Sequence, residues 1–155
     1  MPSESSEPPA LSSPPRLICT QADCINLLKI ELDQSPGQAG SYQIDIEADG
    51  RRGHCEITLP VPKCGEPAAH CDGTFPIMAI ENGACEKPAK DQALFPIGIG
   101  AAPNELVVRV RGAKMLIAER RVKPKYTVVQ PNGPKCEPTC HSGNVTISLA
   151  PARGK

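Results

Sequence analysis

The sequence predicts an all-β fold in which two sheets pack face to face as a sandwich. Apolar residues alternate with polar residues at a period of two along most of the chain, which is typical of half-buried strands. Eighteen proline and 13 glycine residues supply frequent turns, and no long stretch shows the spacing of an amphipathic helix. A chain of 155 residues is the size of a single domain.

The first predicted strands precede a cysteine-rich loop. Apolar residues alternate with charged ones over residues 28–33. Residues 41–59 are predicted to form a hairpin, because two alternating runs flank a turn at residues 49–53 that tolerates positive φ. Pro60 cannot donate a hydrogen bond to a neighbouring strand and therefore ends the second strand. The cysteine-rich loop is expected to run to about Gly73.

The rest of the chain is predicted to continue as short strands. A second hairpin is expected where Leu106, Val108 and Val110 alternate with arginines and a turn follows. For residues 20–28, a single helical turn is an alternative. About seven to eight short strands between frequent turns favour an immunoglobulin- or fibronectin-III-like sandwich. The other predicted strands cover residues 75–80, 94–99, 115–121, 126–129 and 145–149.

Composition divides the chain into one domain with two short flanking segments. Residues 1–16 are rich in serine and proline and are predicted to be a disordered tether. Residues 17–150 form the predicted sandwich domain, and residues 151–155 a disordered tail. The tether has neither the basic nor the apolar region of a signal peptide. We expect that a signal sequence has been removed from the native protein.

Eight cysteines point to an oxidising compartment, because disulfides persist outside the cytosol and stabilise small domains. We therefore expect an exported protein of the periplasm, the outer-membrane surface or the extracellular space. Eight cysteines allow 105 pairings, so spacing alone fixes none. The favoured set joins sequence neighbours and then the remaining two: Cys19 with Cys24, Cys64 with Cys71, Cys136 with Cys140, and Cys55 with Cys85.

A proline-rich loop before the last strand is the candidate binding loop. A bridge between Cys136 and Cys140 would close a short ring, and the prolines would fix φ, so the loop is expected to be rigid and exposed. The candidate binding residues are Pro131, Asn132, Gly133, Pro134, Pro138 and His141.

Each of the three histidines adjoins a cysteine, as His54-Cys55, His70-Cys71 and Cys140-His141. Thiolate and imidazole are ligands of zinc, so a small metal-binding protein that uses these pairs is one alternative. Cysteines in disulfides cannot ligate a metal, however, and the spacing lacks the paired clips of structural zinc sites. We therefore predict no metal site and no cofactor.

The sequence shows no catalytic constellation. The pentapeptide Gly-x-Ser-x-Gly and the phosphate-binding loop are both missing. Asp45 and Glu47 are predicted to share a solvated strand face, and Cys55 is predicted to point away from its neighbour His54. The chain is therefore not expected to be an enzyme.

Two partner classes are disfavoured by composition. Positive and negative residues balance, with 17 of each, so no net field attracts nucleic acid. Aromatic residues make up only 3% of the chain, which leaves few platforms for stacking bases or sugars. No run of about 18 apolar residues is long enough to span a bilayer, so membrane association is expected only through a lipid anchor that this chain does not carry.

The run Pro-Asn-Gly-Pro-Lys-Cys-Glu-Pro-Thr-Cys at residues 131–140 and four shorter segments resemble an uncharacterised group of exported, lipoprotein-like, Cys-rich β-sandwich proteins of myxobacteria and their relatives. The resemblance covers most of residues 17–150, and it implies export and a lipid-anchored mature form. Its most specific element is Pro-Asn-Gly-Pro-x-Cys-x-Pro-x-Cys at residues 131–140. The other similar segments are residues 55–60, 82–85, 103–110 and 123–126.

From these observations the function expected is that of a non-catalytic, envelope-associated or secreted binding or structural module that presents disulfide-constrained loops. Its partner would be another protein or an envelope component. The alternative from a different class is a secreted protease inhibitor, which would use the loop between Cys64 and Cys71 or that between Pro131 and Cys140.

Overall fold

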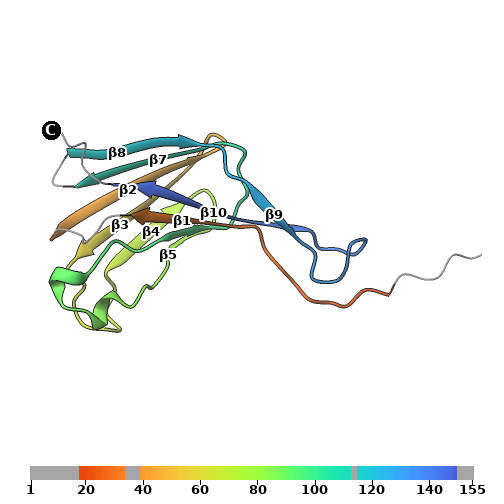
Figure 1. The fold of residues 1–155 in the computed structure, drawn as a ribbon, viewed down its shortest axis with the longest axis horizontal. Coiled ribbons are helices and arrows are strands. Elements are labelled where there is room, and N and C mark those ends of the chain that lie inside the picture. The colour runs from red at the N-terminus through yellow and green to blue at the C-terminus, as the bar shows by residue number, and fades with distance from the viewer. Residues whose placement is uncertain (1–17, 34–38, 113–114, 150–155) are drawn as a thin grey trace, which may run out of the picture.

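The protein is a sandwich of two five-stranded sheets, as predicted. A computed structural model describes residues 18–33, 39–112 and 115–149 (Figure 1). One sheet, sheet A, has the strand order β5-β6-β1-β10-β9, and the other, sheet B, has the order β4-β3-β2-β7-β8. The predicted tether (1–16) and tail (151–155) lie outside the described residues.

Within the described residues the sandwich has ten strands, rather than the seven to eight expected. The strand that the sequence did not predict is β4, whose five residues lie in the stretch expected to be a cysteine-rich loop and are too few to show a clear pattern. The strands are β1 (Leu27–Asp33), β2 (Gly40–Ala48), β3 (Arg51–Leu59), β4 (Ala69–Gly73), β5 (Ile77–Ala79), β6 (Ile97–Ile99), β7 (Leu106–Gly112), β8 (Met115–Val122), β9 (Tyr126–Val129) and β10 (Cys140–Ser148).

Sheet B contains both predicted hairpins. Strands β2 and β3 pair antiparallel from Gly40 opposite Leu59 to Ala48 opposite Arg51. The turn between them uses positive φ at Asp49 and Gly50, as the sequence predicted. Strands β7 and β8 form the second hairpin. The stretch predicted as a cysteine-rich loop instead contains β4, which pairs with β3 at the edge of the sheet.

Sheet A is built around a parallel pair that the sequence did not predict. Strand β1 runs parallel to β10, from Leu27 opposite Ser142 to Asp33 opposite Ser148. Strand β10 begins at Cys140, five residues before the predicted start at Val145. The helical turn considered for residues 20–28 is wrong, because this segment is extended and leads directly into β1.

The core lies between the sheets and consists of the alternating apolar residues of both. Leu28 and Ile30 of β1 are fully buried, and so are Ile44 and Ile57 of the facing sheet. Their polar neighbours face outward, which is the pattern that the sequence predicted. Within the described residues the helices are two short 3-10 turns, η2 (Ala84–Glu86) and η3 (Ala89–Asp91). None there is long and apolar enough to cross a membrane.

The eight cysteines form four disulfides, and all four expected pairings are wrong. The pairs are Cys19 with Cys136, Cys24 with Cys140, Cys55 with Cys71, and Cys64 with Cys85. Neighbours such as Cys19 and Cys24 lie in an extended segment, which separates their Cα atoms by roughly 3.3 Å per residue and prevents a bridge. Each of these cysteines instead pairs across to a neighbouring segment.

Candidate functional site: a disulfide-held finger

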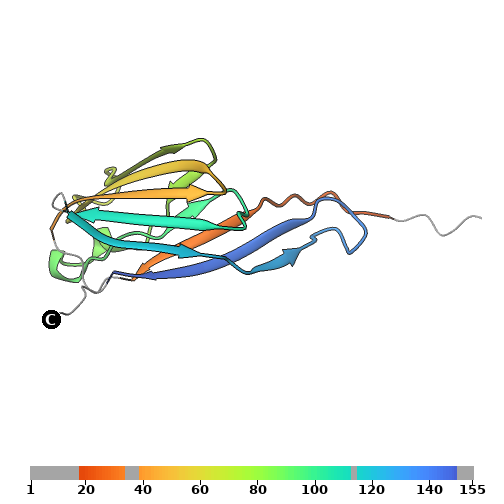
Figure 2. The same ribbon diagram turned by 90° about the horizontal axis from the view of Figure 1, so that it is seen from above.

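A narrow projection extends from one end of the sandwich. It consists of residues 18–26 and residues 126–141, and we call it the finger. Figures 1 and 2 show the extended segment before β1 running beside the turn that joins β9 to β10, well beyond the two sheets. The parallel pairing of β1 with β10 explains the projection, because the segments that lead into the two strands lie side by side at the same end of the sandwich.

Two disulfides join the two halves of the finger. Cys19 is bridged to Cys136, with a Cα–Cα distance of 5.8 Å, and Cys24 is bridged to Cys140, with a distance of 6.2 Å. Near the second bridge, Asn26 accepts a hydrogen bond through Oδ1 from the backbone N–H of His141, at 2.8 Å. The bridges and this bond hold residues 19–26 extended.

Asn132 organises the tip of the finger. Its Nδ2 donates to the carbonyls of Ala22 (2.8 Å) and Glu137 (2.7 Å). Its Oδ1 accepts the backbone N–H of Ala22 (2.8 Å) and the hydroxyl of Thr20. The amide thereby satisfies all of its donors and acceptors while it is only 9% exposed. Asn132 was predicted as a binding residue, but the structure places it inside the finger, where it has a structural role.

Two consecutive turns shape the loop between Gln130 and Cys136. The carbonyl of Gln130 accepts a hydrogen bond from the N–H of Gly133, and the carbonyl of Gly133 accepts one from that of Cys136, both at 3.1 Å. Pro131 and Pro134 occupy the second positions of these turns, where their fixed φ is favourable. The φ of Gly133 is +107°, a value that favours glycine.

The other predicted binding residues have different positions. Pro131 and Pro134 are exposed at the tip, whereas Pro138 and His141 are half-buried. His141 lies at the base of the finger, where its ring meets the ring of Tyr126 edge-on at a centroid distance of 6.1 Å. Fewer of the predicted binding residues are therefore exposed at the tip than the sequence suggested.

Tyr126 attaches the base of the finger to the sandwich. Its hydroxyl donates to the carbonyl of Pro103 at 2.6 Å, and its ring fills the space that a side chain at Gly143 would need. Burial, with a smaller contribution from the negative charge of Asp49, raises the pKa of Tyr126 to about 12.

The finger also displays apolar side chains that sequence reasoning missed. Ile18, Ile25 and Val128 are exposed, the last two by 71% and 54%. Residues 18–26 were placed in the sandwich domain, with a helical turn considered for residues 20–28, and no contact role was assigned to their apolar side chains. The detectable signal was that Cys19 and Cys24 have nearly the same spacing as Cys136 and Cys140, as two bridges between parallel extended segments require.

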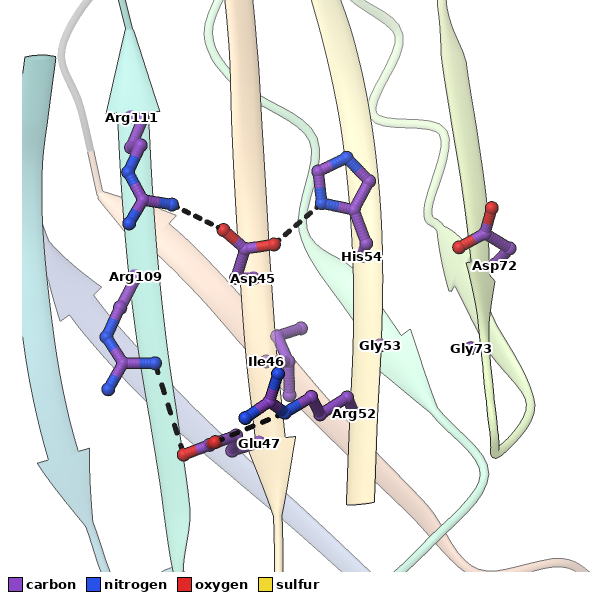
Figure 3. Close-up of a pocket in the computed structure, with 10 residues that line it drawn as sticks. All are labelled: Asp45, Ile46, Glu47, Arg52, Gly53, His54, Asp72, Gly73, Arg109 and Arg111. Carbon is purple, nitrogen blue, oxygen red and sulfur yellow. Dashed lines mark hydrogen bonds and ion pairs between the residues drawn. The ribbon is translucent and has the colours of Figure 1, made fainter. Parts of the chain in front are cut away.

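A charged hollow on the outer face of sheet B is the second candidate site (Figure 3). Asp45 lies between His54 and Arg111, each at 2.7 Å. Glu47 lies 3.5 Å from Arg52 and 4.0 Å from Arg109. The carboxylates thus face solvent and basic partners, as predicted for Asp45 and Glu47. No serine, threonine, cysteine or tyrosine is among the described residues that line the hollow.

Comparison of the chain with protein-family models, with curated proteins and with solved structures gave no match. The four disulfides are typical of proteins from an oxidising compartment. They also use every thiol of the chain, so the thiolate–imidazole zinc site considered from the sequence is not available to the oxidised protein.

Proposed function

We propose that the protein is a non-catalytic binding module of the cell envelope or the extracellular space, and that the finger is its contact surface. The partner is another protein or an envelope component. The observation that carries this proposal is the construction of the finger, in which two disulfides and a buried asparagine hold a projecting segment that packs little against the core.

Rigidity supports the binding role. A segment that is ordered before binding loses less conformational entropy when a partner arrives. The cost of ordering an interface side chain or loop is about 0.5–1.5 kcal/mol for each group immobilised. A disulfide-held finger avoids much of this cost for its backbone.

The exposed apolar residues of the finger supply contact area. Ile25 lies on the N-terminal segment of the finger and Val128 on β9, and the residues next to each in sequence are uncharged. A partner could therefore bury both without desolvating many charges. The consecutive turns at residues 130–136 argue against the protease-inhibitor alternative for this loop, because a substrate-like inhibitor presents extended backbone to the protease.

The test compares crosslinking from exposed apolar positions of the finger with crosslinking from one on the sandwich. A photo-crosslinking residue at position 128 or 25 should join the protein to a discrete envelope partner, which mass spectrometry then identifies. The matched control carries the same residue at Met115, which is 68% exposed on β8 of the sandwich. Ile25→Glu should weaken binding to the purified partner at least about tenfold, because it places a charge in an apolar contact. Equal crosslinking from all three positions would contradict the proposal.

A further inference from the structure

Four side chains with metal-ligand chemistry form a compact group on sheet B, away from the finger. His54 and Glu56 belong to β3, and His70 and Asp72 belong to β4. The pairing of the two strands places His54 opposite Asp72 and Glu56 opposite His70. The group therefore alternates histidine and carboxylate along each strand and across the pair.

The disulfide between Cys55 and Cys71 fixes this arrangement. The two cysteines lie directly opposite each other between the two His/carboxylate pairs. Their side chains face the core, where Cys55 is fully buried, so the neighbours of each cysteine face outward. Because a covalent bond prevents any slip in register, the four outward side chains stay together. In the two His-Cys dipeptides, at residues 54–55 and 70–71, the cysteines therefore form the disulfide that sets the register, and no thiolate is needed as a metal ligand.

His54 is already oriented as a metal ligand would be. Its Nδ1 lies 2.7 Å from Oδ1 of Asp45, and a carboxylate can only accept, so Nδ1 carries the proton. Arg111 holds the other oxygen of Asp45 at 2.7 Å (Figure 3). The lone pair is therefore on Nε2, which lies 3.9 Å from Oε2 of Glu56. A carboxylate that orients a histidine in this way is characteristic of metal sites.

The remaining ligands need only side-chain rotation. Nε2 of His70 lies 3.8 Å from Oδ2 of Asp72, and both side chains are exposed. Two tetrahedral ligands at about 2.0–2.2 Å from one zinc ion are about 3.3–3.6 Å apart, so each His/carboxylate pair must close by only a few tenths of an ångström to hold an ion. Among the described residues, no three such side chains converge on one point as they stand. Diagonal neighbours on a strand pair have Cβ atoms about 7–8 Å apart, a gap that two imidazoles can span.

We propose that His54, His70 and one or both of Glu56 and Asp72 bind a divalent transition-metal ion of the zinc and copper class across β3 and β4. Two imidazoles with carboxylates suit these ions, whereas calcium and magnesium prefer oxygen ligands alone. The ion would join β4, at the edge of sheet B, to β3. The site is independent of the finger and of the proposed binding function.

The test titrates ZnCl₂ into the untagged, chelator-treated protein by calorimetry. Wild type should bind one ion saturably, and His54→Ala or His70→Ala should each weaken binding at least about tenfold. His141→Ala is the matched control, because it removes the third histidine, which lies in the finger, and should leave the affinity unchanged. Wild-type affinity in both the His54 and His70 variants, or no saturable binding below roughly millimolar zinc, would overturn the proposal.

A second measurement distinguishes a shared ion from separate weak sites. Cu²⁺ bound to wild type should show electron paramagnetic resonance couplings to two nitrogens, and His70→Ala should reduce them to one. Asp45→Asn keeps all four proposed ligands and should weaken zinc binding about tenfold, because it removes the negative charge that orients His54 and makes its Nε2 a better ligand. Glu119→Gln makes the same charge change on the same face and should have no such effect. Coupling to one nitrogen in wild type would contradict the two-histidine site.

Discussion

At the scale of single residues, two polar side chains control the finger. Asn132 joins the tip to the N-terminal segment with three hydrogen bonds and makes a fourth to the carbonyl of Glu137 within the tip. Tyr126 fastens the base to the carbonyl of Pro103. Asn132 is buried and Tyr126 is half-buried, and both satisfy their side-chain polar groups within the protein. The finger is thus held by specific bonds rather than by a core of its own.

The raised pKa of Tyr126, about 12, predicts a loss of stability at alkaline pH. The folded protein favours the neutral phenol, so the stabilisation is fully present below the unfolded pKa of about 10 and is lost as the pH rises from 10 to 12. Tyr126→Phe cannot ionise and should lack this loss. Denaturant unfolding of both proteins at several pH values between 8 and 12 measures the difference, which should shrink across this interval. A constant difference would show that the phenol does not titrate as proposed.

At the scale of elements, the finger consists of two segments joined by two disulfides, Cys19–Cys136 and Cys24–Cys140, which close almost the same loop of the chain. The bridges span 117 and 116 residues of sequence. Once one disulfide has closed the long loop, the second closes only a small ring between the two disulfides. The ring is small because Cys19 is near Cys24 in sequence and Cys136 is near Cys140. The two bridges are therefore coupled in their effect on the unfolded chain.

We predict that removing one of the two finger disulfides lowers the free energy of unfolding far less than removing both. Replacing Cys19 and Cys136 by serine should lower the free energy of unfolding by about 2–3 kcal/mol, since the long loop stays closed. Replacing all four finger cysteines should cost more than twice as much, because the long loop then opens. Denaturant titration measures the unfolding free energies. Strictly equal and additive losses from the two bridges would contradict the coupling.

At the scale of the whole molecule, the chain crosses from sheet B to sheet A beside Gly53. Strand β4 belongs to sheet B and β5 to sheet A, and Phe75 lies between them in sequence and is buried. A Cβ atom on Gly53 would lie 2.8 Å from the ring of Phe75 and 2.9 Å from the side chain of Ile77. The absence of a side chain at Gly53 therefore makes room for the crossing.

Gly53→Val should destabilise the sandwich by about 1–3 kcal/mol, because the added side chain overpacks the contact with Phe75 and Ile77. The control is Thr58→Val, which introduces the same residue at an exposed position of the same strand and should change stability by less than about 0.5 kcal/mol. Thermal or denaturant unfolding measures both. A neutral Gly53→Val variant would show that Phe75 is free to move aside.

Much of the sandwich was readable because burial on one face imposes a period of two. Both hairpins of sheet B followed from alternation and from turn residues such as Asp49 and Gly50. The parallel pairing of β1 with β10 left no such signal, because its partners are separated by the whole domain. The proline-rich loop proposed for binding lies between β9 and β10, although its last residues, Cys140 and His141, already belong to β10. Asn132 was assigned to display rather than to the interior, since polarity alone does not reveal burial.

The sequence by itself determined the all-β class, the hairpins and the outward direction of His54 beside the inward Cys55, because these depend on neighbours along one strand. Only the tertiary structure decided which cysteines pair, that residues 18–26 join β9 and β10 in a finger, and that His54 and His70 share a face. Each of these depends on which strands lie side by side. That arrangement is set by the packing of the two sheets around one core, a property of the entire chain that no local pattern contains.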